Sequence, residues 1–463
     1  MSEIPRITSF ARSDEYRSQI HQLIPGGAHT YSRGDDQFPS QAPAAIVRGK
    51  GGRVWDLDGN EYVDCSMALG SVSLGHAYEP VLEAVRAQLE LGAAFQRPAA
   101  VELDLAREFL EVIPGGDRVK FGKNGSTVTS AAVKLARAHT GRELVAFPGN
   151  HAFYSYDDWF IGRTLAHSGV PEAVRALAVT YNSLDPDTLA KRFQEHPGRI
   201  ACVITEPEEV IPASPDLIRE VARLARANGA VLIVDEMVTG YRAGFPGVSW
   251  ELGLDPDLVT WGKASGNGFS FCALTGRADI MDLGGIVQPS RPRVFLISTT
   301  HGGEAHALAA ARAVIREYRV KDVLGRHREL AAAVAEGMRK AVAAHGLDGV
   351  VEVHAAPWRV ITLYRDGDGR ISTPLRTLML QEMIARGVLF QGVFLPTFTH
   401  TDADVSHVVR AFDESCAVYA EAVRYGVEKF LVGPPTRPVF RKYNGCAQTC
   451  PSTPCPLETS CRG

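Results

Sequence analysis

The sequence predicts an α/β fold in which a mostly parallel central sheet is covered by helices on both faces. Between about residues 77 and 276, short apolar runs alternate with amphipathic helical segments. The clearest unit has a strand-like run at 199–204, a helix at 215–228 and a second apolar run at 230–234. Repeated strand–helix units of this kind form parallel sheets, whose ligands bind beyond the carboxyl ends of the strands.

The helix expected at 215–228 has the pattern of a helix packed on a sheet. Its apolar residues recur at helical spacing and form one stripe, made of Leu217, Ile218, Val221, Leu224 and Ala225. The arginines of the same segment fall on the solvent side. A further apolar run at 257–261 follows after one more connection and adds a strand to the sheet.

The pattern changes after about residue 304. Helical segments are expected at 305–318, 328–345 and 402–425, with strands at 350–354 and 358–364, which is typical of a smaller α/β domain. Six prolines from residue 433 onward exclude regular structure over most of the end of the chain. We therefore expect an N-terminal segment (1–76), a large domain (77–304), a small C-terminal domain (305–432) and a Pro- and Cys-rich tail (433–463).

The composition excludes several classes of protein. The 463 residues include 49 Lys and Arg against 53 Asp and Glu, and 45% are hydrophobic. A chain of this kind is globular and soluble, with no general attraction to nucleic acid or to an anionic membrane. Residues 1–27 lack the apolar core of a signal peptide, and no apolar run approaches the roughly 18 residues of a membrane helix. We expect a cytoplasmic protein without nucleic-acid or membrane partners.

Three polar features lie at the ends of predicted strands. Asp235 ends one apolar run, Lys263 ends another, and the loop 122–127 opens a helix. Taken singly, such a loop is usually an ordinary helix cap, such an acid is structural and such a lysine is solvated. Together they offer N–H groups for a phosphate, an acid for a pyridine nitrogen and an amine for an aldehyde. These are the parts needed to hold pyridoxal phosphate.

The chemistry expected of these groups is specific. Lys263 would form a Schiff base with the cofactor aldehyde, while Asp235 keeps the pyridine nitrogen protonated so that the ring acts as an electron sink. The released Lys263 amine is the natural carrier of the proton taken from the substrate. Because its ammonium must lose a proton to react, a desolvated or cation-rich setting is expected.

The stretch 235–242, Asp-Glu-Met-Val-Thr-Gly-Tyr-Arg, resembles the Asp-Glu-Val-x-Thr-Gly-Phe-Arg signature of class III aminotransferases, and Gly262-Lys263 follows at the family's spacing. Further matching stretches lie, in the family's order, at 23–27, 54–62, 74–76, 181–182, 206–207 and 400–401. The chain is most similar to the glutamate-1-semialdehyde 2,1-aminomutase subfamily, over about residues 20 to 425. The resemblance implies the fold of a type I PLP-dependent transferase, with pyridoxal 5'-phosphate as cofactor.

The resemblance implies roles for individual residues. Lys263 is the Schiff-base lysine, Asp235 is the partner of the pyridine nitrogen, and Met237 lies against one face of the ring. Glu206 matches a glutamate near the ring hydroxyl, with support of its strand end as the alternative.

The phosphate group and the neighbouring subunit are implied in the same way. Asn124, Gly125 and Ser126 stand where the family has Ser-Gly-Thr and should hold the phosphate. Thr300 matches the threonine that reaches the phosphate in the other subunit. The implied assembly is a homodimer with two shared active sites.

Departures from the family concern the substrate pocket. His151 is the best candidate for the residue that stacks on the ring, with Phe153 and Tyr154 as alternatives because the register is uncertain by a residue. Leu69 replaces a tryptophan, which should widen the pocket. Arg33 aligns with the arginine that grips the substrate carboxylate, and a guanidinium fork fits a carboxylate or phosphate. The alternative is a surface arginine in a charged loop.

The function expected is that of a PLP-dependent aminotransferase. In a ping-pong mechanism through the Lys263 Schiff base, it would take an amino group from a small-molecule donor and give it to the aldehyde or ketone of a small or sugar-like acceptor. The alternatives are an aminomutase, which moves the amino group within one molecule, and an amino-acid racemase or epimerase.

The tail carries a hypothesis of another class. Cys446, Cys450, Cys455 and Cys461 supply four thiols, enough for a tetrahedral zinc or an iron–sulfur cluster in an interaction module. Their spacing lacks the paired Cys-x2-Cys of common zinc knuckles. The alternatives are a tail with incidental thiols or a terminus that covers a neighbouring subunit.

Overall fold

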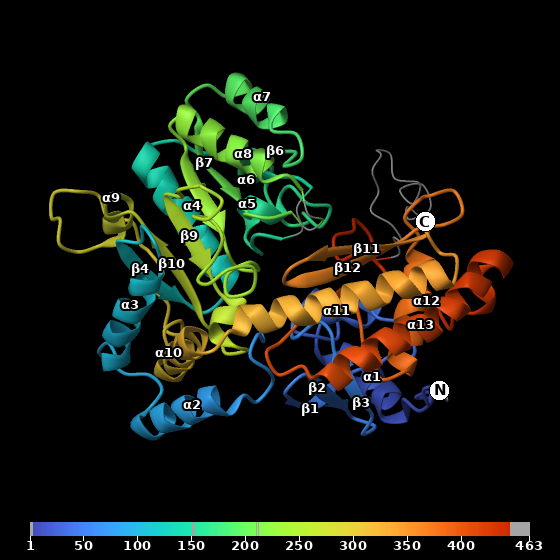
Figure 1. Ribbon diagram of the computed structural model, residues 1–463. Coiled ribbons are helices and arrows are strands. Elements are labelled where there is room, and N and C mark those ends of the chain that lie inside the picture. The colour runs from blue at the N-terminus through green and yellow to red at the C-terminus, as the bar shows by residue number, and fades with distance from the viewer. Residues whose placement is uncertain (1–2, 151–152, 210, 212, 445–463) are drawn as a thin grey trace. The chain divides into compact units, whose positions relative to one another are not determined.

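The computed structural model describes residues 3–150, 153–209, 211 and 213–444 (Figure 1). Contacts group the chain into two compact units. The central unit comprises Ala68–Leu74 and Tyr78–Gly325, and the terminal unit comprises Met1–Met67, Gly75–Ala77 and Arg326–Gly463. The division into domains ending at residues 76, 304 and 432 stays a prediction.

The central unit is built on a seven-stranded sheet. Its strands, in spatial order, are β4 (Arg118–Gly122), β10 (Cys272–Gly276), β9 (Leu258–Trp261), β8 (Val231–Asp235), β7 (Ile200–Thr205), β5 (Leu144–Pro148) and β6 (Ala178–Tyr181). The strands from β9 to β6 pair in parallel, and only β10 pairs antiparallel, with β9 and with β4. Every residue of β7 and β8 is buried, as expected of strands covered on both faces.

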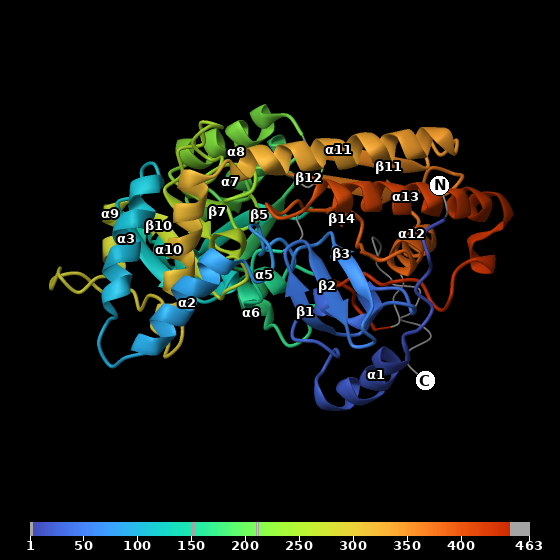
Figure 2. The same ribbon diagram turned by 60° about the horizontal axis from the view of Figure 1, so that its bottom comes forward.

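The helices of this unit cover the sheet or, like α2 (Glu79–Leu91), pack on another helix (Figures 1 and 2). They are α2, α3 (Ala100–Val112), α4 (Gly125–Thr140), α5 (Asp158–Ile161), α6 (Glu172–Arg175), α7 (Asp187–Glu195), α8 (Pro215–Ala227), α9 (Ala278–Met281) and α10 (Ala305–Val320), with short 3-10 turns η3 (Lys263–Gly266) and η4 (Asp282–Gly284). The apolar stripe of α8 packs with α7 against one face of β5–β8. The Ser214 side chain accepts the Asp216 N–H and Pro215 opens the helix, so α8 begins where its sequence predicts.

The terminal unit has two smaller sheets. One contains β1 (Ile46–Lys50), β2 (Arg53–Asp56), β3 (Glu61–Asp64) and β13 (Val388–Leu389), and the other contains β11 (Val351–Ala356), β12 (Arg359–Tyr364) and β14 (Val393–Phe394). Its helical elements are α1 (Ala11–Leu23), η1 (Tyr31–Arg33), η2 (Asp35–Gln37), α11 (Val323–Ala344), α12 (Thr373–Ala385), α13 (Asp402–Tyr425) and η5 (Val427–Lys429). Helices α11, α12 and α13 share one core, to which Met338, Met379 and Phe412 contribute. In the described residues, none of the helices is long and apolar enough to cross a membrane.

A buried charge network fixes the start of the chain to this core. The Glu382 carboxylate accepts hydrogen bonds from Arg6 Nη1 at 2.5 Å and from Arg386 Nη1 at 2.7 Å. Arg386 Nε also contacts Glu414 at 3.1 Å, and the Glu414 carboxylate accepts the Ile4 N–H. Although burial opposes it, the hydrogen bonds from Arg6 and Arg386 lower the pKa of Glu382 to about 2. The anionic form of Glu382 therefore stabilises the folded state.

Replacing Glu382 with Gln is expected to lower the free energy of unfolding near pH 7 by about 3 kcal/mol, since the variant loses the charge that two arginines contact. The folded pKa of about 2 lies below the ordinary value of 4.5, so this contribution is complete above pH 4.5 and is lost as the pH falls through 2. Chemical denaturation of both proteins at several pH values measures the difference. Glu336→Gln, which removes an exposed partner of Lys340, is the matched control and should leave stability unchanged. A difference for Glu382→Gln that did not shrink in acid would contradict this account.

Candidate active site

Asp235 and Lys263 lie at the ends of neighbouring strands. Asp235 is the last residue of β8 and pairs with Thr260 of the parallel strand β9, and Lys263 follows β9 by two residues. Parallel neighbours end at the same edge of a sheet, so the topology brings the predicted acid and the predicted lysine together.

The Asp235 carboxylate is 2% exposed and fixed by its own strand edge. Its Oδ1 accepts the Met237 N–H and the Thr260 hydroxyl, both at 2.9 Å. Burial raises the pKa of Asp235, while the positive charge of Lys263 and these two hydrogen bonds oppose that rise. The carboxylate therefore needs a cation beside it to stay ionised.

The backbone that carries Lys263 is tightly packed. Lys263 has a φ of +46°, in the left-handed region that non-glycine residues rarely occupy. A Cβ on the preceding Gly262 would lie 2.5 Å from the Met237 sulfur and 2.6 Å from the Cys272 sulfur. The Lys263 N–H donates to the Cys272 sulfur, and burial raises the pKa of that thiol to about 12. Position 262 is therefore restricted to glycine by two sulfur atoms behind the lysine.

The amino end of α4 lies beside the same methionine. Asn124 is the N-cap, and its Oδ1 accepts the Thr127 N–H at 3.0 Å. A Cβ on Gly125 would lie 3.3 Å from the Met237 sulfur. Gly125 and Ser126 begin the helix, where backbone N–H groups have no intrahelical acceptor and the helix dipole favours an anion. Of the three residues predicted to hold a phosphate, Gly125 therefore lies against Met237.

Glu206 follows β7 and is tied to Tyr154, whose hydroxyl oxygen accepts the Glu206 N–H at 3.2 Å. The Tyr154 ring is buried against Phe147 and Phe160. Phe153 is 48% exposed. His151 lies outside the described residues, so only its two alternatives can be compared. Tyr154 is a core residue and Phe153 is exposed.

Thr300 is exposed, and it lies in a segment held near the phosphate loop. Lys123, which precedes Asn124, forms an ion pair with Glu304 at 2.8 Å. Within the described residues, the Thr300 hydroxyl has no hydrogen-bond partner.

Arg33 belongs to the terminal unit, where it is exposed at the end of η1. Its guanidinium has no hydrogen bond or ion pair to any residue that the structure describes. Asp35 pairs instead with Arg17 and His21, and Asp36 pairs with Arg441. Among the described residues, the charged loop around Arg33 therefore leaves this cation without a counter-ion.

Leu69 belongs to the central unit, where it is half-buried in an unusual turn. Met67, Ala68 and Leu69 have φ values of +44°, +52° and +58°. The buried Arg242 guanidinium holds the next residues, because it donates to the backbone oxygens of Gly70 and Val72 at 2.8 Å. The hydrogen bonds from Arg242 therefore fix the turn that contains Leu69.

Sequence reasoning missed several residues that support this site. They are Thr260, Cys272 and Asn267. The Asn267 Oδ1 accepts the N–H groups of Ser73 and Leu74. Tyr154 is expected from the sequence only as an alternative stacking residue, and its contact with Glu206 is missed as well. Each acts through a contact distant in the sequence. Two signals in the sequence could have indicated two of them. Side chains alternate between the two faces of a strand, which places Thr260 of β9 on the same face as its partner Asp235. Asn267 is a polar residue in the loop after Lys263.

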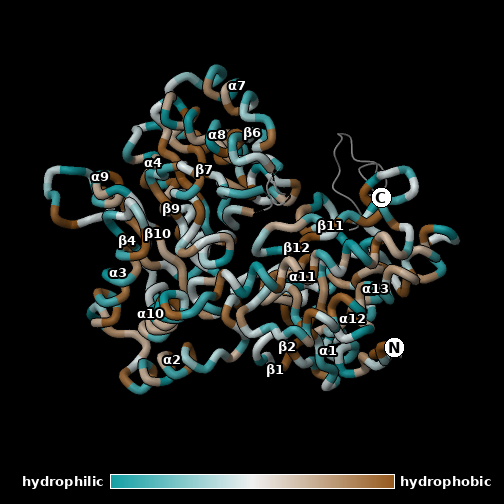
Figure 3. The backbone as a smooth tube through the Cα atoms, viewed as in Figure 1, coloured by the Kyte–Doolittle hydropathy of each residue, from teal (hydrophilic) through white to brown (hydrophobic). Residues whose placement is uncertain are grey.

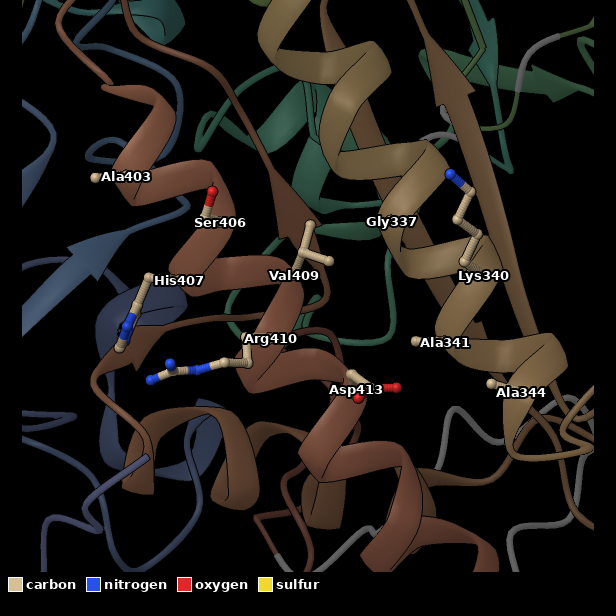
Figure 4. A pocket seen from close by; sticks show the side chains of 10 residues that line it. All are labelled: Gly337, Lys340, Ala341, Ala344, Ala403, Ser406, His407, Val409, Arg410 and Asp413. Atoms are coloured by element: carbon tan, nitrogen blue, oxygen red, sulfur yellow. The ribbon is translucent and has the colours of Figure 1, made fainter. Parts of the chain in front are cut away.

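A separate groove lies between α11 and α13 of the terminal unit, where Figure 4 shows its lining side chains. Its volume is about 820 Å³. His407 Nε2 is hydrogen-bonded to the Arg386 carbonyl, and Arg410 lies 3.8 Å from Glu414. None of the predicted site residues that the structure describes lines this groove. The side chains of His407 and Arg410 already contact other residues of the terminal unit.

Metal binding has no support in the described part of the chain. Those residues include no group of three or more His, Cys, Asp or Glu side chains that could hold an ion. Cys446, Cys450, Cys455 and Cys461 all lie outside the described residues, so the hypothesis of a metal-binding tail stays a prediction.

The comparisons with known proteins agree with this geometry. The family model for aminotransferase class-III matches residues 34–356. The chain belongs to this family. It is 32% identical to the glutamate-1-semialdehyde 2,1-aminomutase of Thermus thermophilus over 430 residues, which cover 87% of this chain and 98% of the relative. It is 30% identical to glutamate-1-semialdehyde 2,1-aminomutase 2 of Bacillus thuringiensis, over 87% of this chain and 97% of the relative.

Solved structures show the same fold for this class III aminotransferase. The FumI protein of Sphingopyxis sp. MTA144, in its PLP internal aldimine form, has a TM-score of 0.81 and 25% identity, over 89% of this chain and 98% of that chain. A glutamate-1-semialdehyde aminomutase from Pseudomonas aeruginosa PAO1 has a TM-score of 0.77 and 22% identity, over 88% and 94%. The predictions of a type I fold, a PLP-dependent enzyme and pyridoxal 5'-phosphate as cofactor are confirmed.

The residues present fit this cofactor. Met237 connects the three groups. Its N–H donates to the buried Asp235 carboxylate, and its sulfur lies against Gly125 at the amino end of α4 and against Gly262, the residue before Lys263. Their chemistry matches a pyridine nitrogen, an aldehyde and a phosphate.

Replacing Gly262 with Ala is expected to displace the backbone of Lys263, because the new Cβ would overlap two sulfur atoms. We expect a loss of about 2 kcal/mol in stability and weakened retention of pyridoxal phosphate. Thermal denaturation and the absorbance of the purified protein measure the two effects. Gly367→Ala is the control, because a Cβ there meets nothing within 4 Å. If Gly262→Ala matched the wild type in both measurements, the sulfur packing would not restrict this position.

Proposed function

We propose that this class III aminotransferase takes an amino group from a small-molecule donor and gives it, in a ping-pong cycle, to the aldehyde or ketone of a small or sugar-like acceptor. The observation that carries the proposal is the placement of a buried Asp235 beside Lys263 at the ends of β8 and β9. The altered pocket residue Leu69 supports a substrate different from that of the aminomutase relatives.

Asp235 would hold the pyridine nitrogen in its protonated form. The hydrogen bonds from Met237 and Thr260 fix Oδ1 and favour the anionic carboxylate. When bound, pyridoxal 5'-phosphate supplies an electron sink for the charge left when a proton leaves the substrate carbon.

Lys263 Nζ would hold the cofactor covalently and then move the substrate proton. Its main chain is fixed by Gly262 and Cys272. The motion this role needs is therefore confined to the lysine side chain.

The remaining groups would orient the cofactor. Gly125 and Ser126 would donate N–H groups to the phosphate, with Asn124 holding the first turn of α4. Met237 would lie against one face of the ring. Glu206, held by Tyr154, would lie near the ring hydroxyl.

The second face of the ring would be covered by the loop after β5. His151 remains the candidate from the sequence. Of its alternatives, exposure favours Phe153 over Tyr154, whose ring is already in the core.

Arg33 and Leu69 would select the substrate. An exposed guanidinium that no described carboxylate contacts suits a carboxylate or phosphate of a substrate. A leucine in place of a tryptophan leaves room for a bulkier group, and the turn that presents it is fixed by Arg242.

A glutamate-1-semialdehyde aminomutase activity is the second candidate, because relatives at 30 to 32% identity carry that name. The two activities differ in whether the keto product leaves between the half-reactions. A racemase or epimerase would need no acceptor and would exchange the substrate α-proton with deuterium from the solvent.

A single-turnover experiment tests the proposal. The enzyme, converted to the amino form with a donor, should return to the aldehyde form when a keto acceptor is added, as followed by cofactor absorbance. Lys263→Ala should slow this by about 10³-fold or more because it removes the proton carrier, whereas the exposed Lys191→Ala should not. Turnover of glutamate-1-semialdehyde without reversion by any of a broad panel of acceptors would establish the aminomutase instead.

We also propose a homodimer in which Thr300 serves the partner's site. The exposed apolar side chains of the central unit support an interface. They are Leu89, Leu91, Phe95, Leu103, Ile286, Val287 and Phe295. The segment after α9, which contains Ile286 and Val287, extends away from the central sheet in Figures 1 and 3.

Mixed dimers test the shared site. Thr300→Ala is expected to weaken cofactor retention about tenfold, the loss of one hydrogen bond to a charged group. Refolding it together with Lys263→Ala should restore about half of the wild-type activity per mixed dimer, because one site then contains both Lys263 and Thr300. If the mixture gave only the sum of its parents, Thr300 would act within its own subunit or not at all.

A further inference from the structure

The chain continues past the region that the family model matches. Residues 432–444, here called the C-terminal strap, follow α13 and η5 without regular structure. The strap is nevertheless packed, since Thr436 is only 2% exposed. Its contacts connect two distant parts of the terminal unit.

One set of contacts fixes the strap to α12. The Thr436 N–H donates to the Thr377 hydroxyl at 3.0 Å, and Arg376 Nη1 donates to the Thr436 hydroxyl at 3.1 Å. The Val432 N–H donates to Gln381 Oε1 at 2.8 Å. These bonds anchor the strap on a helix whose residues are almost all buried.

A second set of contacts reaches the segment that follows Arg33. The Arg437 N–H donates to the Asp36 carbonyl, and Gln37 Nε2 donates to the Arg437 carbonyl, both at 2.8 Å. Arg441 Nη2 lies 2.5 Å from Asp36 Oδ2. The strap therefore holds η2 by backbone and by charge.

A buried arginine gives a further link. Arg376 Nη2 donates to the Gln391 carbonyl at 2.9 Å, and Gln391 Nε2 donates to the Ser32 carbonyl at 3.4 Å. Through Arg376, the anchor of the strap also reaches the residue before Arg33.

The charges explain why these contacts affect Arg33. Asp35 and Asp36 are the acids nearest to Arg33 in sequence, and either could pair with it in a loose loop. Arg17 and His21 of α1 occupy Asp35, and Arg441 occupies Asp36. With both carboxylates paired elsewhere, an incoming anion does not have to displace an internal partner.

We propose that the C-terminal strap is a positioning element for Arg33: by holding η2 and pairing Arg441 with Asp36, it keeps the Arg33 guanidinium available for a substrate that carries a carboxylate or phosphate. This rests on the substrate role proposed for Arg33. Arg441 itself touches no substrate and acts through Asp36.

Hydrogen exchange of the full-length enzyme tests the positioning directly. In Arg441→Ala, amides of residues 31–38 should exchange several-fold faster than in the wild type. Arg437→Ala is the matched control, because its side chain donates to the Asn444 carbonyl and the strap reaches η2 through its backbone. Unchanged exchange in Arg441→Ala would overturn the proposal.

Binding of glutarate, followed by the cofactor absorbance of the holoenzyme, tests the consequence for an anion. Arg33→Ala and Arg441→Ala should each raise the dissociation constant about three- to tenfold, and Arg437→Ala should not. If Arg33→Ala bound glutarate more weakly and Arg441→Ala bound it as the wild type does, the role proposed for the C-terminal strap would be overturned and the substrate role of Arg33 would stand. Absence of glutarate binding to the wild type, or no effect of Arg33→Ala, would overturn the substrate role proposed for Arg33 even if hydrogen exchange had changed.

Discussion

The buried carboxylate of Asp235 is the constraint on which the candidate site of the central unit depends. A carboxylate with almost no access to water is unstable as an anion unless a cation and hydrogen-bond donors surround it. The sheet supplies these in order: Met237 from the next turn, Thr260 from the neighbouring strand and Lys263 from the loop beyond it. The parallel pairing of β8 and β9 thus forms part of the central sheet, and it is also the reason that Asp235 and Lys263 lie close together.

Much of this arrangement could be predicted from the sequence, because local patterns carry it. The apolar runs before Asp235 and Lys263 show that the first ends a buried strand and that the second closely follows one, and parallel strands end at a common edge of the sheet. The family signature then gives the cofactor. The helix start at α8 is equally local, since Ser214 and Pro215 mark it.

Other features could not be predicted, because they depend on contacts between distant segments. Cys272 lies behind Lys263 only because β10 runs antiparallel to β9 and returns to the same edge. Tyr154 and Phe153 are adjacent in sequence, and only the packing shows that the first belongs to the core. The ion pair of Arg441 with Asp36 joins residues about 400 positions apart, and the spacing of apolar residues along the sequence does not indicate such a contact.

The return of β10 also decides how Lys263 can move. The loop between β9 and β10 is held at both ends by sheet hydrogen bonds, and two sulfur atoms pack behind Gly262. The backbone of Lys263 is therefore held in place, and the amine can move only through rotations about the bonds of its four methylene groups. Rotations within such a side chain need no change of the backbone, whereas hinge motions of a loop take microseconds to milliseconds. The reach of the amine is set by bond rotations, so the role proposed for Lys263 requires no rearrangement of the loop.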